Sequence, residues 1–226
     1  MTIRSLALAT IWIALSGCSG TQVREHVHKS ISVGSAPSVR IDNAVGQIRV
    51  TGWQQNTIDI EAVKDGMSLD AVRNIDIDVQ TNGNDVTIAT KYHGFGNGGV
   101  AYTISVPAGS SLDIANSTGE IRIEGVDGDV KATAQTGSVV VNAGRVSAKR
   151  SIDLTATTGS IKLAIDSHSD ARVDARASLG DVKSDFPSVE SSRQNVVGAS
   201  ASGTIGRGSA SIRLTTTTGS IALLQR

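Results

Sequence analysis

The chain has 226 residues, enough for one or two domains, and 39% of them are hydrophobic, so a core can form. Aromatic residues make up only 3%, so that core must consist mainly of Ile, Val, Leu and Ala. Basic and acidic residues number 21 each, and this balance lacks the basic excess expected of a nucleic-acid-binding protein.

The amino terminus has the features of an export signal. Arg4 precedes an apolar run over residues 5–15 that is too short to span a bilayer stably. The run ends in Leu15-Ser16-Gly17-Cys18, which resembles the bacterial lipobox, whose cysteine is lipidated and becomes the first residue of the mature protein. We therefore expect a signal peptide over residues 1–17 and a membrane anchor on Cys18; a plain signal peptide with a chance cysteine is the alternative.

Cys18 is the single cysteine, so the chain can build neither an internal disulfide nor a cysteine metal site. A lipid anchor places the mature protein in the cell envelope. Ser19 follows the cysteine, and a residue other than aspartate at this position resembles outer-membrane sorting if the organism is diderm.

Residues 18–30 are polar and predict a lipidated tether. His26 and His28 lie inside it at positions i and i+2, where both imidazoles can point the same way and bind a metal ion. No third ligand lies nearby in the sequence, so we favour a solvated linker and expect no metal or cofactor.

The segment after the tether predicts short strands and one short helix. Ser68 can cap a helix over residues 68–73, and Asn82-Gly83-Asn84 predicts a hairpin turn. Residues 91–99 are glycine-rich and irregular, which favours a flexible loop over a ligand-contacting one. Apolar residues alternate with polar ones, as in half-buried strands, near residues 31–33, 39–41, 48–50, 58–62, 75–79, 86–88 and 102–106.

A repeat dominates the chain from residue 111 onward. Gly119, Gly128 and Gly137 follow one another at intervals of nine residues, and each is followed by one polar residue and then by alternating apolar residues. The main copies at glycines 119, 137, 159, 180 and 219 are 18, 22, 21 and 39 residues apart, and the last step is close to twice twenty. Glycine accepts positive φ without steric cost, so we expect these residues to form corners. The expected corner glycines are Gly46, Gly119, Gly128, Gly137, Gly159, Gly180 and Gly219.

These features predict an all-β, single-chain β-solenoid over residues 31–226, with coils of about twenty residues in the repeat. Such a fold requires Ile121, Val139 and Ile161 to lie on adjoining coils. A β-sandwich is the alternative, since strands at intervals of 8–12 residues fit it too. The solenoid is favoured because the same glycine corner returns and hairpin turns are scarce after residue 84.

The end of the chain departs from the period. Residues 188–208 are rich in Ser, Gly and Ala and predict an extended loop with one degenerate coil at residues 202–205. The strands over 211–214 and 220–224 then form the terminal coil, whose open edge makes self-association possible.

No combination of residues predicts catalysis. Polysaccharide cleavage needs two carboxylates about 5–9.5 Å apart. Asp127 with Asp129, or Asp76 with Asp78, stand at i and i+2 and could meet this distance, whereas Asp181 and Asp185 are too far apart on a strand. Acidic residues that alternate outward for solubility explain all of them equally well. The histidines His93 and His168 have no nucleophile motif beside them, and we interpret residues 166–170 as a polar corner.

The order of the motifs resembles the bacterial putative adhesin family, a domain of unknown function found in envelope lipoproteins. The residues that carry the resemblance are 102–109 (YTISVPAG), 112–121 (LDIANSTGEI), 206–208 (GRG) and 215–221 (TTTTGSI). The resemblance implies a β-solenoid exposed on the cell envelope, and it brings no catalytic residues.

We therefore expect a membrane-anchored lipoprotein whose solenoid is a non-catalytic interaction scaffold for an unknown protein or glycan. Two alternatives are a β-helix enzyme that acts on polysaccharides and a regulatory partner in envelope stress. No enzymatic activity and no nucleic-acid binding are expected.

Overall fold

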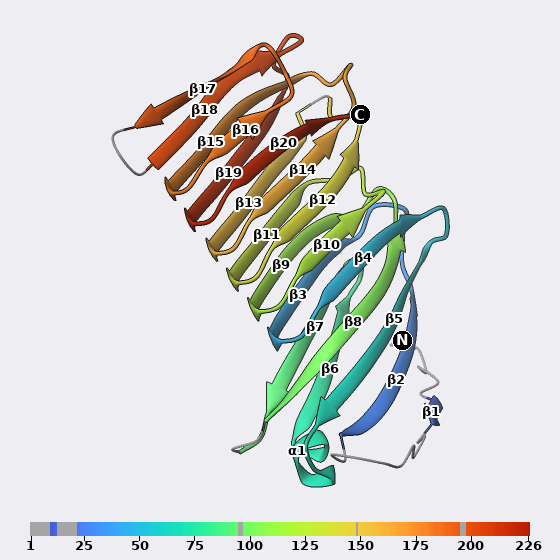
Figure 1. Ribbon diagram of the computed structural model, residues 1–226. Coiled ribbons are helices and arrows are strands. Elements are labelled where there is room, and N and C mark those ends of the chain that lie inside the picture. Colours follow the sequence, from blue (N-terminus) through green and yellow to red (C-terminus); the bar gives the residue numbers. More distant parts are fainter. Residues whose placement is uncertain (1–9, 13–21, 95–96, 148, 195–197) are drawn as a thin grey trace.

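The computed structural model describes residues 10–12, 22–94, 97–147, 149–194 and 198–226. Two ten-stranded sheets face each other and form a long stack (Figure 1). We call them sheet A and sheet B. Sheet A runs in the order β1 (Thr10–Trp12), β2 (Val23–Ser32), β5 (Thr57–Gly66), β8 (Gly98–Pro107), β4 (Ile48–Trp53), β10 (Ile121–Glu124), β12 (Val139–Gly144), β14 (Ile161–Ile165), β20 (Ile221–Gln225) and β16 (Val182–Ser184).

Sheet B lies opposite, and its strands are generally longer in the repeat. Its order is β17 (Val189–Gln194), β18 (Gly198–Ile205), β15 (Ala171–Leu179), β19 (Ala210–Thr218), β13 (Ser151–Thr158), β11 (Val130–Thr136), β9 (Ser111–Thr118), β3 (Ser38–Val45), β7 (Asp85–Tyr92) and β6 (Ile75–Asn82).

Six coils make up the regular part of the stack. Each has one strand in sheet B, a corner, and one strand in sheet A, and neighbouring coils pair in parallel. Ile121 pairs with Val139, and Val139 pairs with Ile161, so the prediction that they lie on adjoining coils is confirmed. The coils are β3–β4, β9–β10, β11–β12, β13–β14, β19–β20 and β15–β16.

Between the two sheets lies one continuous aliphatic core. Every second residue of each strand points inward, and this is why apolar and polar residues alternate in the sequence. Across sheet A the inward ladder continues through Ile48, Ile121, Val139, Ile161, Ile221 and Val182. The β-solenoid-like, all-β architecture predicted from the sequence is thus observed.

The coils do not follow chain order. The β19–β20 coil lies between the β13–β14 coil and the β15–β16 coil, although residues 171–184 come earlier in the chain. Likewise β3 lies between β7 and β9, and β4 lies between β8 and β10. The expectation that residues 211–214 and 220–224 form an open terminal edge is therefore wrong, because both strands are paired on both sides.

Antiparallel strands close both ends of the stack. At one end β17 and β18 form an antiparallel pair that continues sheet B beyond β15. The extended loop with a degenerate coil that was expected at residues 188–208 is thus wrong for its described part: residues 198–205 form a strand that pairs antiparallel on both sides. At the other end β2, β5 and β8 pair antiparallel in sheet A, and β6 and β7 do so in sheet B.

The tether expected over residues 18–30 is replaced by strand from Val23 onward. Strand β2 pairs with β5 over its full length, from Val23 opposite Gly66 to Ser32 opposite Thr57. Its inward positions include the charged Glu25, which binds the largely buried Lys64 at 3.1 Å. Because this charged residue lies on the core face, the alternation of apolar residues did not predict strand β2.

The short helix and the hairpin are confirmed. Helix α1 (Leu69–Arg73) begins after Ser68, whose hydroxyl accepts a hydrogen bond from the Ala71 amide. Strands β6 and β7 pair up to Asn82 and Asp85, which leaves two residues in the turn. Within the described part of the chain, no helix combines the length and the apolar character that crossing a membrane requires.

Candidate interaction surfaces

The coils turn from sheet B into sheet A at glycines with φ between 126° and 150°, a region that side chains disfavour. At Gly137 a Cβ would also lie 2.1 Å from the Gly119 carbonyl oxygen of the next coil. Stacked corners therefore leave no room for a side chain. The six glycines are Gly46, Gly119, Gly137, Gly159, Gly180 and Gly219.

Gly128, which the sequence grouped with these six, occupies a different place. It lies between β10 and β11, on the opposite edge of the stack, and its φ is not in the left-handed region. Its Cβ would meet the Ser110 carbonyl oxygen at 2.2 Å. A close backbone contact, and not a positive φ, explains this glycine.

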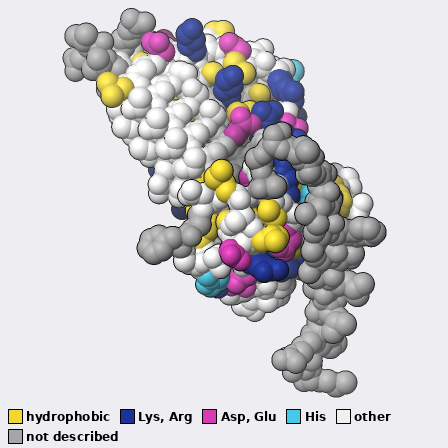
Figure 2. Space-filling view, turned by 60° about the horizontal axis from the view of Figure 1, so that its bottom comes forward, with side chains coloured by type: hydrophobic (Ala, Val, Ile, Leu, Met, Phe, Trp, Pro, Cys, Tyr) yellow, Lys and Arg dark blue, Asp and Glu magenta, His cyan; other side chains and the backbone are white. Residues whose placement is uncertain are grey.

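The glycine corners create an uncharged edge along the middle of the stack. Thr136, Thr158 and Thr218 pair with one another on successive coils and are exposed. In these three coils the residue after the corner glycine is serine, and the Ser160 and Ser220 hydroxyls are 3.2 Å apart. This edge is the broad white area in the upper left of Figure 2. It offers hydrogen-bonding groups at a regular interval of about 4.8 Å, the spacing of paired strands.

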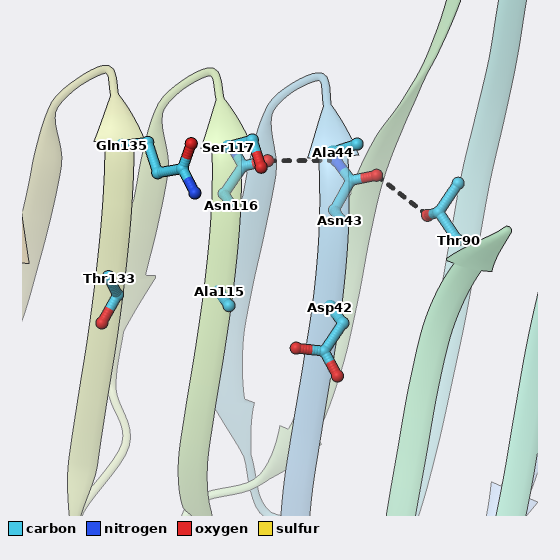
Figure 3. A pocket seen from close by; sticks show the side chains of 9 residues that line it. All are labelled: Asp42, Asn43, Ala44, Thr90, Ala115, Asn116, Ser117, Thr133 and Gln135. Atoms are coloured by element: carbon cyan, nitrogen blue, oxygen red, sulfur yellow. Dashed lines mark hydrogen bonds between the residues drawn. The ribbon is translucent and has the colours of Figure 1, made fainter. Parts of the chain in front are cut away.

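A shallow hollow of about 290 Å³ opens over β7, β3, β9 and β11 near these corners (Figure 3). Asn43 accepts a hydrogen bond from Thr90 at 2.8 Å and donates to the Val100 carbonyl at 3.1 Å. Asn116 donates to the Gly46 carbonyl at 2.8 Å. The two buried amides thus hold the corners of neighbouring coils in place. The hollow is lined by Asp42, Asn43, Ala44, Thr90, Ala115, Asn116, Ser117, Thr133 and Gln135.

Chemically, the hollow offers amides and hydroxyls. Its only carboxylate, Asp42, already accepts hydrogen bonds from the Arg40 guanidinium, the shorter at 2.9 Å. Its lining contains neither a histidine nor a cysteine. The hollow is therefore suited to hydrogen bonding with a polar partner and holds no paired nucleophile and base.

On the outer face of sheet B, charges alternate from coil to coil. Arg40 lies 3.3 Å from Asp113, and Lys131 lies 3.6 Å from the same carboxylate. The hydrogen bond to Asp42 and the charges of Asp42 and Asp113 raise the pKa of Arg40. Sheet B thereby neutralises itself, although each exposed pair contributes less than about 1 kcal/mol. In register, the row reads Arg40, Asp113, Lys131, Asp153, Arg213 and Asp174.

One buried cation was missed by the sequence analysis. Arg150 is only 6% exposed, and its guanidinium donates to the carbonyls of Val126, Gly128 and Ala143, on the edge opposite the glycine corners. Burial lowers its pKa. An arginine between a turn and a strand carries no periodic signal, so no pattern in the sequence could have singled it out.

The carboxylates considered for catalysis are mostly engaged in structural contacts. Asp129 accepts a hydrogen bond from the Ser151 amide at 2.7 Å, and Asp185 accepts one from the Gln225 amide at 3.2 Å. Asp76 faces His93 at 2.9 Å. Hydrogen bonds from Lys91 and Gln80 lower the pKa of Asp78, which makes it a poor proton donor.

The polar segment 166–170 folds on itself as a turn. The Asp166 carboxylate accepts from the His168 amide at 2.7 Å and lies 3.2 Å from its imidazole, which is exposed. The same hydrogen bonds lower the pKa of Asp166. Ser167 contacts His168 at 3.0 Å, but the three groups belong to one turn in which the imidazole is exposed to solvent.

His26 and His28 both lie on the outer side of β2, and His28 contacts Asp59 at 2.7 Å. Among the described residues, no three His, Cys, Asp or Glu side chains come together as metal ligands. The lipidation site predicted at Cys18 lies outside the described residues, as does Phe95 in the loop predicted over 91–99.

Comparison with known proteins gives matches for family and for fold. The family model described as Toastrack DUF4097 matches residues 102–224, more than half of the chain. Among curated proteins, no significant match was found.

Among solved structures, one described as a putative cell adhesion protein from Clostridium sporogenes has a TM-score of 0.65 at 12% identity. The alignment covers 90% of this chain and all of that one. A second, described as a putative adhesin from Bacteroides fragilis, has a TM-score of 0.34 at 12% identity, over 88% of this chain and 97% of that one. At this identity the first match shows a shared fold alone, and the second carries no further argument.

Proposed function

Because the chain belongs to the Toastrack DUF4097 family, we propose that it is an adhesin-like, non-catalytic interaction scaffold of the bacterial cell envelope. The observation that carries this proposal is the stack itself, whose polar side chains recur in register from coil to coil on long outer faces. Solenoids use such extended faces for binding. The structural neighbour from Clostridium sporogenes is described as a putative cell adhesion protein, which agrees with this proposal.

The proposal includes coils of about twenty residues with glycine corners and an anchor on a lipidated Cys18. Val23, where β2 begins, is five positions after Cys18. Extended chain spans at most about 3.6 Å per residue, so the domain would start within roughly 18 Å of the lipid. A scaffold held this closely would act at the membrane surface; in a diderm organism we propose the outer membrane.

The anchor is tested with metabolic labelling by a radioactive or clickable fatty acid, followed by membrane fractionation. We expect the wild-type protein to carry the label in the membrane fraction and Cys18→Ala to lose the label. Ser19→Ala is the matched control and should keep it. Labelled Cys18→Ala protein in the membrane would refute the lipid anchor.

The scaffold function is tested by cross-linking in the native envelope and by a cell-adhesion assay with a deletion strain. We expect at least one specific partner and reduced adhesion. Specific cross-links to a stress-response membrane protein, with normal adhesion, would favour a regulatory role instead. Glycan turnover by the purified protein that is lost in Asp129→Asn would overturn the non-catalytic assignment.

A further inference from the structure

The outer face of sheet A carries basic side chains in a single line along the stack. The register places Val140 and Ala222 at the two positions of this line that bear no charge. Six strands at a spacing of about 4.8 Å make the line roughly 24 Å long. We call this the basic row; its charged members are Arg49 on β4, Arg122 on β10, Lys162 on β14 and Lys183 on β16.

Among the described residues, most of the basic row has no carboxylate within ion-pair distance. Arg122 pairs with Glu120 at 2.8 Å. Among the described residues, no carboxylate lies within 4.0 Å of Arg49, Lys162 or Lys183, and all three are exposed. These three cations are therefore available to bind an anionic partner.

The contrast with sheet B makes this arrangement notable. There, opposite charges face each other on successive coils, as Asp113 does with Lys131. On sheet A, Arg49 lies directly opposite Arg122, and like charges in this position destabilise a sheet. The same repeat thus pairs its charges on sheet B, whereas on sheet A three described cations have no ion-pair partner among the described residues. An anion beside Arg49 would relieve the repulsion from Arg122 that remains despite the pairing of Arg122 with Glu120.

We propose that the basic row binds a linear anionic polysaccharide that lies along the stack. The proposal deepens the scaffold function and rests on it. Beyond Arg49 the line continues through Thr103 to Glu61, whose charge ends the site. The polymer therefore covers the coils from β4 to β16, with acidic groups meeting cations that are about 5 to 10 Å apart.

The narrow width of the basic row favours a linear polymer over a planar membrane surface as its partner. The row is one residue wide, and Glu124 lies in the flanking line on one side and Glu120 on the other. A planar anionic membrane would press against both carboxylates, whereas a chain laid over the row avoids them. Nucleic acid is disfavoured because the chain as a whole has no basic excess and only 3% aromatic residues for base stacking.

The test uses the full-length protein in detergent micelles and alginate, a linear polyuronate, with neutral dextran as the control polymer. Calorimetric titration at low and high salt should show binding of alginate alone, weakening as salt screens the charges. The variant carrying Arg49→Gln, Lys162→Gln and Lys183→Gln should lose roughly a hundredfold in affinity, about fivefold for each cation. Arg122 is left in place because Glu120 already neutralises it.

A matched control removes three cations from sheet B: Arg40→Gln, Lys131→Gln and Arg213→Gln. This variant has the same net charge and should bind alginate within about threefold of wild type. Thermal melts of both variants establish that they fold. Equal losses in the two variants, or no alginate binding by the wild type, would overturn the proposal.

Two further ligands test the class of partner. Phosphatidylglycerol vesicles or a single-stranded oligonucleotide that binds more tightly than alginate, through the same three residues, would overturn the polysaccharide assignment. If alginate fails while native cross-linking still captures a specific partner, the basic row is refuted and the scaffold function stands.

Discussion

Arg150 allows a sharp test of how the edge opposite the glycine corners is held together. Its guanidinium is the common donor to three backbone carbonyls, at 2.8 Å for Gly128, at 3.0 Å for Ala143, and to Val126. In Arg150→Met the aliphatic part of the side chain is retained and all three donors are lost. The carbonyls lie where water is largely excluded, since Arg150 is itself only 6% exposed.

The expected magnitude follows from two opposing effects. A buried carbonyl without a donor costs about 1–3 kcal/mol, so three of them cost roughly 3–9 kcal/mol. Removing a buried guanidinium that forms no ion pair with a described carboxylate, although the charges of Asp127 and Asp129 act on it, returns several kcal/mol of desolvation energy. We expect the free energy of unfolding of Arg150→Met to fall by about 2–4 kcal/mol.

Urea unfolding followed by circular dichroism measures this change. Arg145→Met is the matched control, because Arg145 is exposed in the preceding loop and should shift the free energy by no more than about 0.5 kcal/mol. Arg150→Lys should fall between the two, since an ammonium cannot reproduce the planar fork. If the free energy of unfolding of Arg150→Met lies within about 0.5 kcal/mol of the wild-type value, water must satisfy the three carbonyls, and the explanation given for Arg150 is wrong.

Two other predictions concern the corners and the core. Gly137→Ala should destabilise the protein by about 3 kcal/mol or more, because its Cβ would meet the Gly119 carbonyl. Gly144 also has positive φ but has open space around it, so Gly144→Ala should cost about 1 kcal/mol in the same urea assay. Equal costs for the two variants would contradict the stacked-corner explanation. Burial raises the pKa of Tyr102 to about 12, so between pH 10 and pH 12 the free energy of unfolding should fall by about 2 kcal/mol more in the wild type than in Tyr102→Phe, when both proteins are unfolded across that pH range.

The direction of the Tyr102 effect follows from linkage. Above pH 10 the unfolded chain releases the phenolic proton, while the folded protein, with Tyr102 only 2% exposed, retains it up to the higher pKa. Unfolding is therefore increasingly favoured over this interval. A wild-type curve that runs parallel to that of Tyr102→Phe would contradict the burial argument.

Local signals in the sequence were sufficient to predict most strands of the repeat. Alternation at Ile121 and Ile123, or at Val139 and Val141, reports directly which face of a strand is buried, because side chains of a strand alternate. The Ser68 cap and the Gly83 turn are likewise local, since each depends on a few neighbouring residues. Such features do not require knowledge of which strands become neighbours.

The order of the coils could not be predicted, because all copies of the repeat present similar edges. Ile212 is as good a neighbour for Ile152 as Val173 would be, and only the connections decide between them. Strand β18 was missed for a related reason. Its inward residues Ala199 and Ala201 give too weak an apolar contrast to mark a strand, yet they suffice against a partner that is already paired.

The surfaces also depend on this order. The charge alternation on sheet B arises only when Arg213 lies between Asp153 and Asp174, which are separated from it by many residues in the chain. The unpaired line on sheet A likewise requires Lys183 to follow Ala222. Such rows become visible only once the register is known.

The placement of the β19–β20 coil has a consequence for biosynthesis. Residues 171–205 leave the ribosome before residues 210–225 do, yet the later segment separates them from the coil formed by residues 151–165. Residues 171–205 must therefore either remain unpaired until the later segment has been made, or pair temporarily with the coil of residues 151–165 and then be displaced from it. Proteolysis that removes β19 and β20 would therefore take a coil out of the interior of the stack and not from its end. The complete stack can form only when this last part of the chain is intact.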